Sequence, residues 1–78
     1  MSPDRRCVIA IDAGTTGVRS RAVFPDAPSV ASYREFTQFY PQPGWVEHDA
    51  VEIWERVRDT LHDVVDEVRT GGGEVAAI

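Results

Sequence analysis

A run of acidic, glycine, threonine and arginine residues stands near the start of the chain: Asp12, then Gly14-Thr15-Thr16-Gly17, then Arg19. Glycines let a backbone approach an anion closely, and successive N–H groups in a tight turn point into one concavity that suits a phosphate. Threonine hydroxyls add donors, and a carboxylate at the end of a buried strand can hold a magnesium ion through water. The spacing is therefore compatible with a phosphate-binding turn, with Arg19 within reach of a terminal phosphate.

These residue types also have a plainer interpretation. Glycine and threonine are ordinary residues of hairpin turns, and a buried strand can end in aspartate simply as a cap. The run lacks the Gly-Lys-Ser/Thr of a Walker A loop and the Gly-x-Gly-x-x-Gly of a dinucleotide-binding turn. On these residues alone, a hairpin turn without a ligand stays open as the alternative.

Three strands are expected to position this turn. The continuous apolar run Cys7–Ile11 predicts a strand buried on both faces, and the glycines of 14–17 predict a tight turn that is free to adopt unusual dihedral angles. The alternating segment Val18–Phe24 predicts a half-exposed strand that forms a hairpin with the first. A third strand, from Val30 to about Thr37, completes a meander over residues 7–40.

A helix over residues 49–70 is predicted next. Asp49 is its expected cap, and Glu52 stands three residues later in capping-box position. Glu52 is also placed for an ion pair with Arg56, and His48 for a local hydrogen bond at the helix entry. Apolar residues recur at three- and four-residue steps and predict the face that packs on the sheet: Ile53, Trp54, Val57, Leu61, Val64, Val65 and Val68.

The order of elements predicts an α/β fold. Gly71-Gly72-Gly73 ends the helix, and the apolar residues of 74–78 begin another strand. A β-β-β-α-β order, with antiparallel hairpins followed by a crossover, places this last strand parallel to the first and beside it. Trp45 and Trp54 are expected to be core anchors.

Composition and charge exclude several classes of protein. The chain has 78 residues, of which 42% are hydrophobic and 27% charged, which is typical of a globular protein and not of a disordered polyelectrolyte. No apolar run is long enough to cross a bilayer, and no secretion signal is recognisable, so a cytoplasmic location is expected. Its lone cysteine, Cys7, excludes an internal disulfide, and no Cys/His cluster suggests zinc.

The negative charge of the chain is concentrated in the predicted helix. Eight acidic residues and three arginines between Glu47 and Arg69 account for the whole net charge of −5. The remaining residues are neutral in sum and form no basic patch. We therefore expect neither a nucleic acid nor a membrane as a partner.

Two segments resemble a known family. Asp12-x-Gly14-Thr15-Thr16-x-x-Arg19 resembles the first phosphate loop of the FGGY carbohydrate kinases, within the superfamily of actin, sugar kinases and heat-shock ATPases. The segment from Arg34 to Trp54, with its Pro-Gly-Trp-Val-Glu-His-Asp run, is similar to the early region of glycerol kinases. The resemblance extends from Val8 to Ile78 and implies a partial actin-like, ribonuclease H-like ATPase domain.

The resemblance also implies a role for each residue of the turn. Asp12 would hold a magnesium ion through water, and no residue of this chain would be catalytic. Arg19 would lie near the γ-phosphate of ATP. The residues implied to bind ATP are Gly14, Thr15, Thr16, Gly17 and Arg19. Two positions depart from the family pattern, because Ala13 stands where glycerol kinases usually have Gln and Gly17 where they usually have Ser. The loss of that serine hydroxyl leaves the substrate subfamily open.

The resemblance implies that residues 1–78 are the N-terminal fragment of a kinase domain, with residues 1–6 as a disordered lead. The parent enzyme would use MgATP and glycerol and would form glycerol 3-phosphate and ADP. The fragment would be inactive alone and would self-associate through its incomplete sheet. The alternatives are a kinase for another polyol or sugar, or a standalone phosphate-binding or dimerising module without catalysis.

Overall fold

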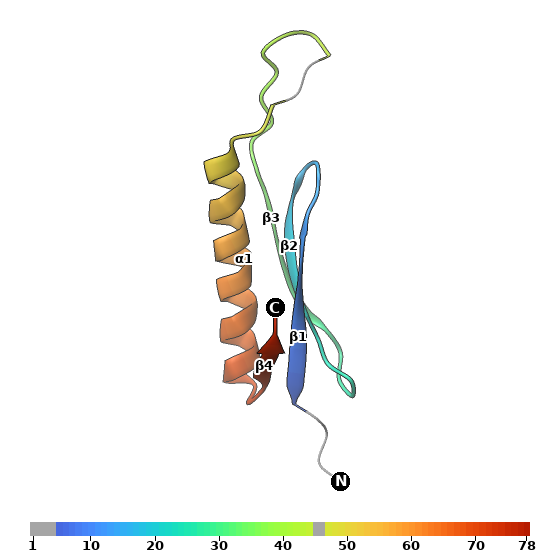
Figure 1. Ribbon diagram of the computed structural model, residues 1–78. Coiled ribbons are helices and arrows are strands. Elements are labelled where there is room, and N and C mark those ends of the chain that lie inside the picture. The colour runs from blue at the N-terminus through green and yellow to red at the C-terminus, as the bar shows by residue number, and fades with distance from the viewer. Residues whose placement is uncertain (1–4, 45–46) are drawn as a thin grey trace.

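The computed structural model describes residues 5–44 and 47–78, which form a mixed sheet with one helix on one of its faces (Figure 1). The sheet has four strands in the order β3-β2-β1-β4. The bounds of the elements are β1 Arg6–Ala13, β2 Gly17–Val23, β3 Val30–Glu35, α1 Ala50–Thr70 and β4 Glu74–Ala77. The predicted α/β class and the predicted order of elements are confirmed. Within the described residues, no helix has both the length and the apolar character that crossing a membrane requires.

The strand pairings agree with the predicted topology. β1 pairs with β2 and β2 with β3, both antiparallel, whereas β4 lies parallel to β1 after the chain has passed through α1. Two predicted boundaries are wrong: Arg6 already belongs to β1, and β3 ends at Glu35 rather than near Thr37. Residues 1–4 of the predicted disordered lead lie outside the described residues.

The apolar core lies between the sheet and the C-terminal half of α1. Its buried members are Cys7, Ile9, Ala22, Val64 and Val68. The prediction that β1 is buried on both faces is wrong, because α1 covers only one face and Val8 on the other is 53% exposed. Trp54 is also no core anchor, since it is 63% exposed. Trp45, the other predicted anchor, lies outside the described residues.

The N-terminus of α1 is capped by Asp49, as predicted. Its side chain accepts hydrogen bonds from the N–H groups of Val51, at 2.8 Å, and Glu52, at 3.4 Å. The predicted capping box is wrong, because the Glu52 carboxylate turns to Thr37 and accepts from its N–H and, at 3.0 Å, from its hydroxyl. The helix start is thereby joined to the segment that follows β3.

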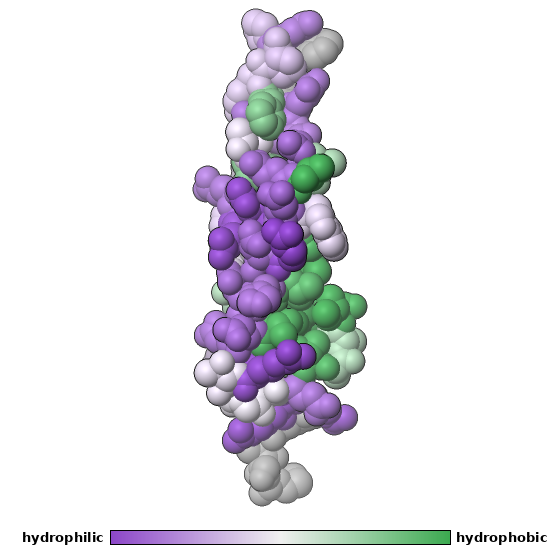
Figure 2. Space-filling view, turned by 90° about the vertical axis from the view of Figure 1, so that its left-hand side faces the viewer, coloured by the Kyte–Doolittle hydropathy of each residue, from purple (hydrophilic) through white to green (hydrophobic). Residues whose placement is uncertain are grey.

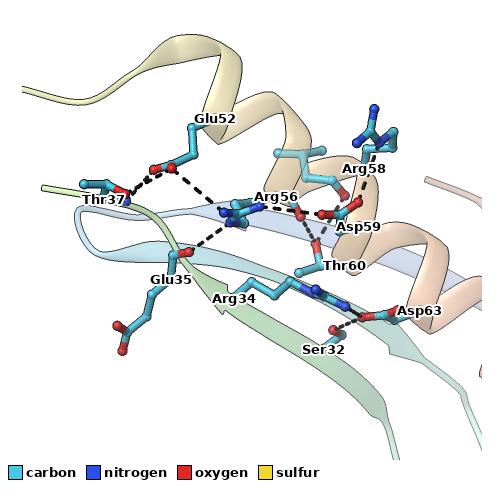
Figure 3. A network of polar contacts seen from close by, with 11 residues as sticks. Ser32, Arg34, Glu35, Thr37, Glu52, Arg56, Arg58, Asp59, Thr60 and Asp63 are labelled. Carbon is cyan, nitrogen blue, oxygen red and sulfur yellow. Dashed lines mark hydrogen bonds and ion pairs between the residues drawn. The ribbon is translucent and has the colours of Figure 1, made fainter.

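A row of polar contacts joins α1 to β3 and to the segment that follows β3 (Figure 3). Arg56 donates to the carbonyl of Glu35 at 3.1 Å and lies 3.9 Å from the Glu52 carboxylate, which confirms the predicted ion pair. Further along, the Asp63 carboxylate accepts from Arg34 at 2.8 Å and from Ser32 at 2.9 Å. These two donors hold the pKa of Asp63 below its usual range, and Asp63 in turn raises the pKa of Arg34.

One polar contact between the helix and the sheet is fully buried. The hydroxyls of Ser20 and Thr60 lie 2.9 Å apart, and both residues are 0% exposed. The Thr60 hydroxyl also donates to the carbonyls of Arg56 at 2.9 Å and Val57 at 3.2 Å. The outward surface of α1 is in contrast largely hydrophilic, as the space-filling view shows (Figure 2).

Candidate functional site

The candidate site is the turn between β1 and β2, which lies at the same end of the molecule as the start of α1 (Figure 1). The N–H of Gly14 donates to the carbonyl of Gly17 at 2.9 Å and closes a connection made by Thr15 and Thr16. Among the described residues, φ is positive only at Gly44 and Gly72. The turn at 14–17 therefore does not use the freedom for positive φ that its two glycines offer.

The two carbonyls of the connection are bound from the segment after β3. The N–H of Phe36 donates to the carbonyl of Thr16 at 3.2 Å, and Gln38 Nε2 donates to the carbonyl of Thr15 at 3.0 Å. Tight hairpins usually take mirror-image turns with positive φ, so a turn without positive φ benefits from such outside support. For the N–H groups of Thr15 and Thr16, residues 5–44 and 47–78 offer no acceptor. These donors are the ones that a phosphate would use.

Gln38 is itself held in place by His48. His48 Nε2 lies 2.8 Å from Gln38 Oε1, and the His48 ring packs edge-on against Phe36 with 4.7 Å between the ring centroids. The local hydrogen bond expected of His48 is therefore confirmed. Because Gln38 Oε1 is occupied, its amide nitrogen is the group that faces Thr15. The link from the helix entry to the turn is a contact that sequence reasoning missed.

Arg19 lies in a row with Asp12 and Tyr33 across three strands. Asp12 pairs with Arg19 in the register of β1 and β2, and Arg19 with Tyr33 in that of β2 and β3. Side chains alternate along a strand, and Val18 and Ser20 are buried under α1, so the row stands on the opposite face. The Arg19 guanidinium lies 5.1 Å from the centre of the Tyr33 ring.

The two glycines of the turn differ in what requires them. A Cβ at Gly14 would meet nothing closer than the Gly17 carbonyl at 3.8 Å, so the space above Gly14 is open to a ligand. A Cβ at Gly17 would lie 2.5 Å from the Arg34 carbonyl and 2.6 Å from the Tyr33 hydroxyl. Gly17 therefore cannot be exchanged for serine without moving its neighbours.

Asp12 offers a single carboxylate for a metal ion. It is exposed near the end of β1, directly opposite Arg19 in the register. The described residues contain no group of three or more His, Cys, Asp or Glu side chains that could hold a metal. One carboxylate fits magnesium, which keeps most of its water and shares the phosphate oxygens of a nucleotide, and it does not fit an all-protein metal site.

Comparison with known proteins relates the chain to sugar and polyol kinases. Residues 7–78 match the N-terminal domain of the FGGY family of carbohydrate kinases. The chain is 45% identical over 76 residues to a glycerol kinase of Enterobacter sp. (strain 638), covering 96% of this chain and 15% of the relative. It is 48% identical over 75 residues to a glycerol kinase of Shewanella pealeana, covering 95% and 15%. The chain thus spans 15% of the length of these two relatives.

Proposed function

Because the chain belongs to the FGGY family of carbohydrate kinases, we propose that residues 12–19 form the first phosphate-binding turn of an ATP-dependent polyol kinase. The parent reaction is transfer of the γ-phosphoryl group of MgATP to a terminal hydroxyl of glycerol, giving glycerol 3-phosphate and ADP. The surrounding β-β-β-α-β unit is then part of an actin-like ATPase domain. The proposal rests on the turn itself, in which Phe36 and Gln38 donate hydrogen bonds to the carbonyls of Thr16 and Thr15.

Each residue of the turn has a proposed task. The N–H groups and hydroxyls of Thr15 and Thr16 bind phosphate oxygens, and the missing Cβ of Gly14 lets the ligand come close. Arg19 neutralises charge at the γ-phosphate, and Asp12 holds magnesium through water. Phosphoryl transfer depends mostly on positioning and on compensating charge, and groups of this kind supply part of both at the phosphates of the nucleotide.

The remaining chemistry is assigned to other parts of the enzyme. A kinase also needs a base for the proton of the acceptor hydroxyl and a pocket for the polyol. We propose that both lie in the part of the kinase that corresponds to the other 85% of the length of its relatives, of which this chain covers 15%. We therefore propose that the 78-residue chain alone has no turnover. Because Gly17 departs from the glycerol kinase pattern, another polyol or sugar is the alternative acceptor.

A coupled assay of ADP release by the full-length protein tests this function, with glycerol and a panel of other polyols and sugars as acceptors. Arg19→Ala and Thr15→Ala should each lower kcat/KM for MgATP about 100- to 1,000-fold, the usual loss when one preorganised donor is removed. The KM for glycerol should stay unchanged. Arg21→Ala is the matched control, because Arg21 stands on the same face of β2 and donates instead to Ser29, at 2.9 Å. Equal activity of all three variants would remove the turn from the mechanism.

A further inference from the structure

We propose that Tyr33, on β3, is a positioning residue for the phosphate-binding turn, an inference that rests on the proposed function. Tyr33 stands outside the turn in sequence, yet it contacts three of its members: Thr16, Gly17 and Arg19. It is 44% exposed, so burial of its own ring gains comparatively little. Its contacts are directed at the groups that would bind the nucleotide.

The hydroxyl of Tyr33 orients the side chain of Thr16. The two oxygen atoms lie 3.0 Å apart, and either can donate. A threonine hydroxyl has one proton and two lone pairs. When the Tyr33 hydroxyl donates, one lone pair of Thr16 is occupied and its own proton is left for a phosphate oxygen. The hydrogen bond thus converts a freely rotating hydroxyl into a directed donor.

The ring of Tyr33 restrains Arg19. The guanidinium lies over the ring at 5.1 Å from its centre, which is within the range of a cation–π contact. A cation–π contact uses the positive charge of the guanidinium and occupies no hydrogen-bond acceptor, so N–H groups of Arg19 remain available for an anion. The long arginine side chain is thereby held beside the turn before any nucleotide binds, and less of its conformational freedom is lost on binding.

Gly17 makes room for this arrangement. A Cβ at residue 17 would lie 2.6 Å from the Tyr33 hydroxyl oxygen and 2.7 Å from the ring carbon that carries it. The phenol group therefore occupies the space that a side chain at position 17 would need. A hydroxyl supplied by Tyr33 stands next to the position from which the usual serine hydroxyl is missing, so Gly17 and Tyr33 act as a pair.

The test is steady-state kinetics of the full-length protein with MgATP and glycerol. Tyr33→Phe removes only the hydroxyl and should raise the KM for MgATP about three- to tenfold, as expected for one hydrogen bond. Tyr33→Leu also removes the ring from Arg19 and should raise it further, with a lower kcat. The KM for glycerol should not change. Tyr40→Phe is the matched control, because Tyr40 is 68% exposed and makes none of these contacts.

A double-mutant cycle separates positioning from a merely structural role. If the Tyr33 hydroxyl acts through Thr16, Tyr33→Phe should add nothing to the effect of Thr16→Val on the KM for MgATP. An active enzyme in which both Tyr33 variants match Tyr40→Phe would overturn the inference and leave the proposed function standing. A full-length protein without ATP-dependent activity on any acceptor would overturn the proposed function, and the inference with it.

Discussion

The two halves of α1 are attached to the sheet in different ways. The C-terminal half contributes Val64 and Val68 to an apolar core with residues of β1 and β2. The N-terminal half is held instead by hydrogen bonds and ion pairs, in which Glu52 and Arg56 contact the end of β3 and the segment after it (Figure 3). The candidate site lies at the polar half. One helix therefore combines a half that contributes to the apolar core with a half that is bound to the chain on either side of Phe36, which contacts the turn.

The comparison explains why function and stability should respond to different substitutions. Apolar burial is roughly proportional to the area removed from water and has no preferred direction, whereas hydrogen bonds fix distances and angles. Contacts such as Gln38 to Thr15 can hold a carbonyl in place while adding little to the free energy of unfolding. The predictions below test this division, from the largest expected loss of stability to the smallest.

The largest loss is expected at Ile9, in the apolar half. Ile9→Ala leaves a cavity between β1 and α1 and should lower the free energy of unfolding by about 2–5 kcal/mol. Ile9 is 2% exposed, whereas Val8, its neighbour on the same strand, is 53% exposed. Val8→Ala is therefore the matched control in denaturant unfolding of the 78-residue chain. Equal losses for the two variants would show that α1 does not pack on this face.

A smaller and asymmetric loss is expected at the buried pair Ser20 and Thr60. Thr60→Val leaves the Ser20 hydroxyl buried without its partner and should cost about 1–3 kcal/mol of unfolding free energy. Ser20→Ala should cost less, because the Thr60 hydroxyl keeps the Arg56 carbonyl at 2.9 Å. Thermal unfolding of both variants measures the difference. A larger loss for Ser20→Ala than for Thr60→Val would mean that the helix carbonyls do not satisfy the hydrogen-bonding capacity of the Thr60 hydroxyl.

The smallest effect is expected at Asp63, where the polar contacts between α1 and β3 continue past the middle of the helix on its exposed side. Arg34 and Ser32 lower the pKa of Asp63 in the folded protein, so the bound carboxylate stabilises the fold above the ordinary pKa of aspartate, about 4. This contribution disappears as the pH falls through the lowered folded-state value. Asp63→Asn should therefore destabilise slightly at pH 7 and not at all in strong acid.

Unfolding at several pH values checks this prediction, with Asp66→Asn, an exposed residue of the same helix, as control. A loss that persists undiminished in strong acid would contradict the pKa argument, since Asp63 would then be protonated in both the folded and the unfolded protein.

The sequence predicts the local features of this fold well. The Asp49 cap and the pairing of β1 with β2 follow from residues that lie near one another in the chain. The exposure of Val8 could not be predicted, because a continuous apolar strand implies two covered faces and the described residues cover one. The contact between Glu52 and Thr37 could not be predicted either, because these residues are 15 positions apart and meet only in the folded chain.

The sequence predicted the residues of the candidate site itself, but not the residues that contact the turn from outside it. Asp12, the turn and Arg19 form a compact motif, and the register brings Asp12 and Arg19 side by side. Gln38 and Tyr33 contact the turn only because β3 pairs with β2 in one particular register. That register places Tyr33 opposite Arg19. The register depends on the lengths of the turn and of the β2–β3 connection, so residue types alone do not reveal it.

The most direct test of the central claim, that this turn binds the phosphates of MgATP, is a calorimetric titration of MgATP into two variants of the full-length protein. Arg19→Ala should raise the dissociation constant about tenfold or more, as for loss of a charge-assisted contact. Arg21→Ala, on the same face of β2 but bound to Ser29, should leave the constant unchanged. The same dissociation constant in both variants would contradict the account.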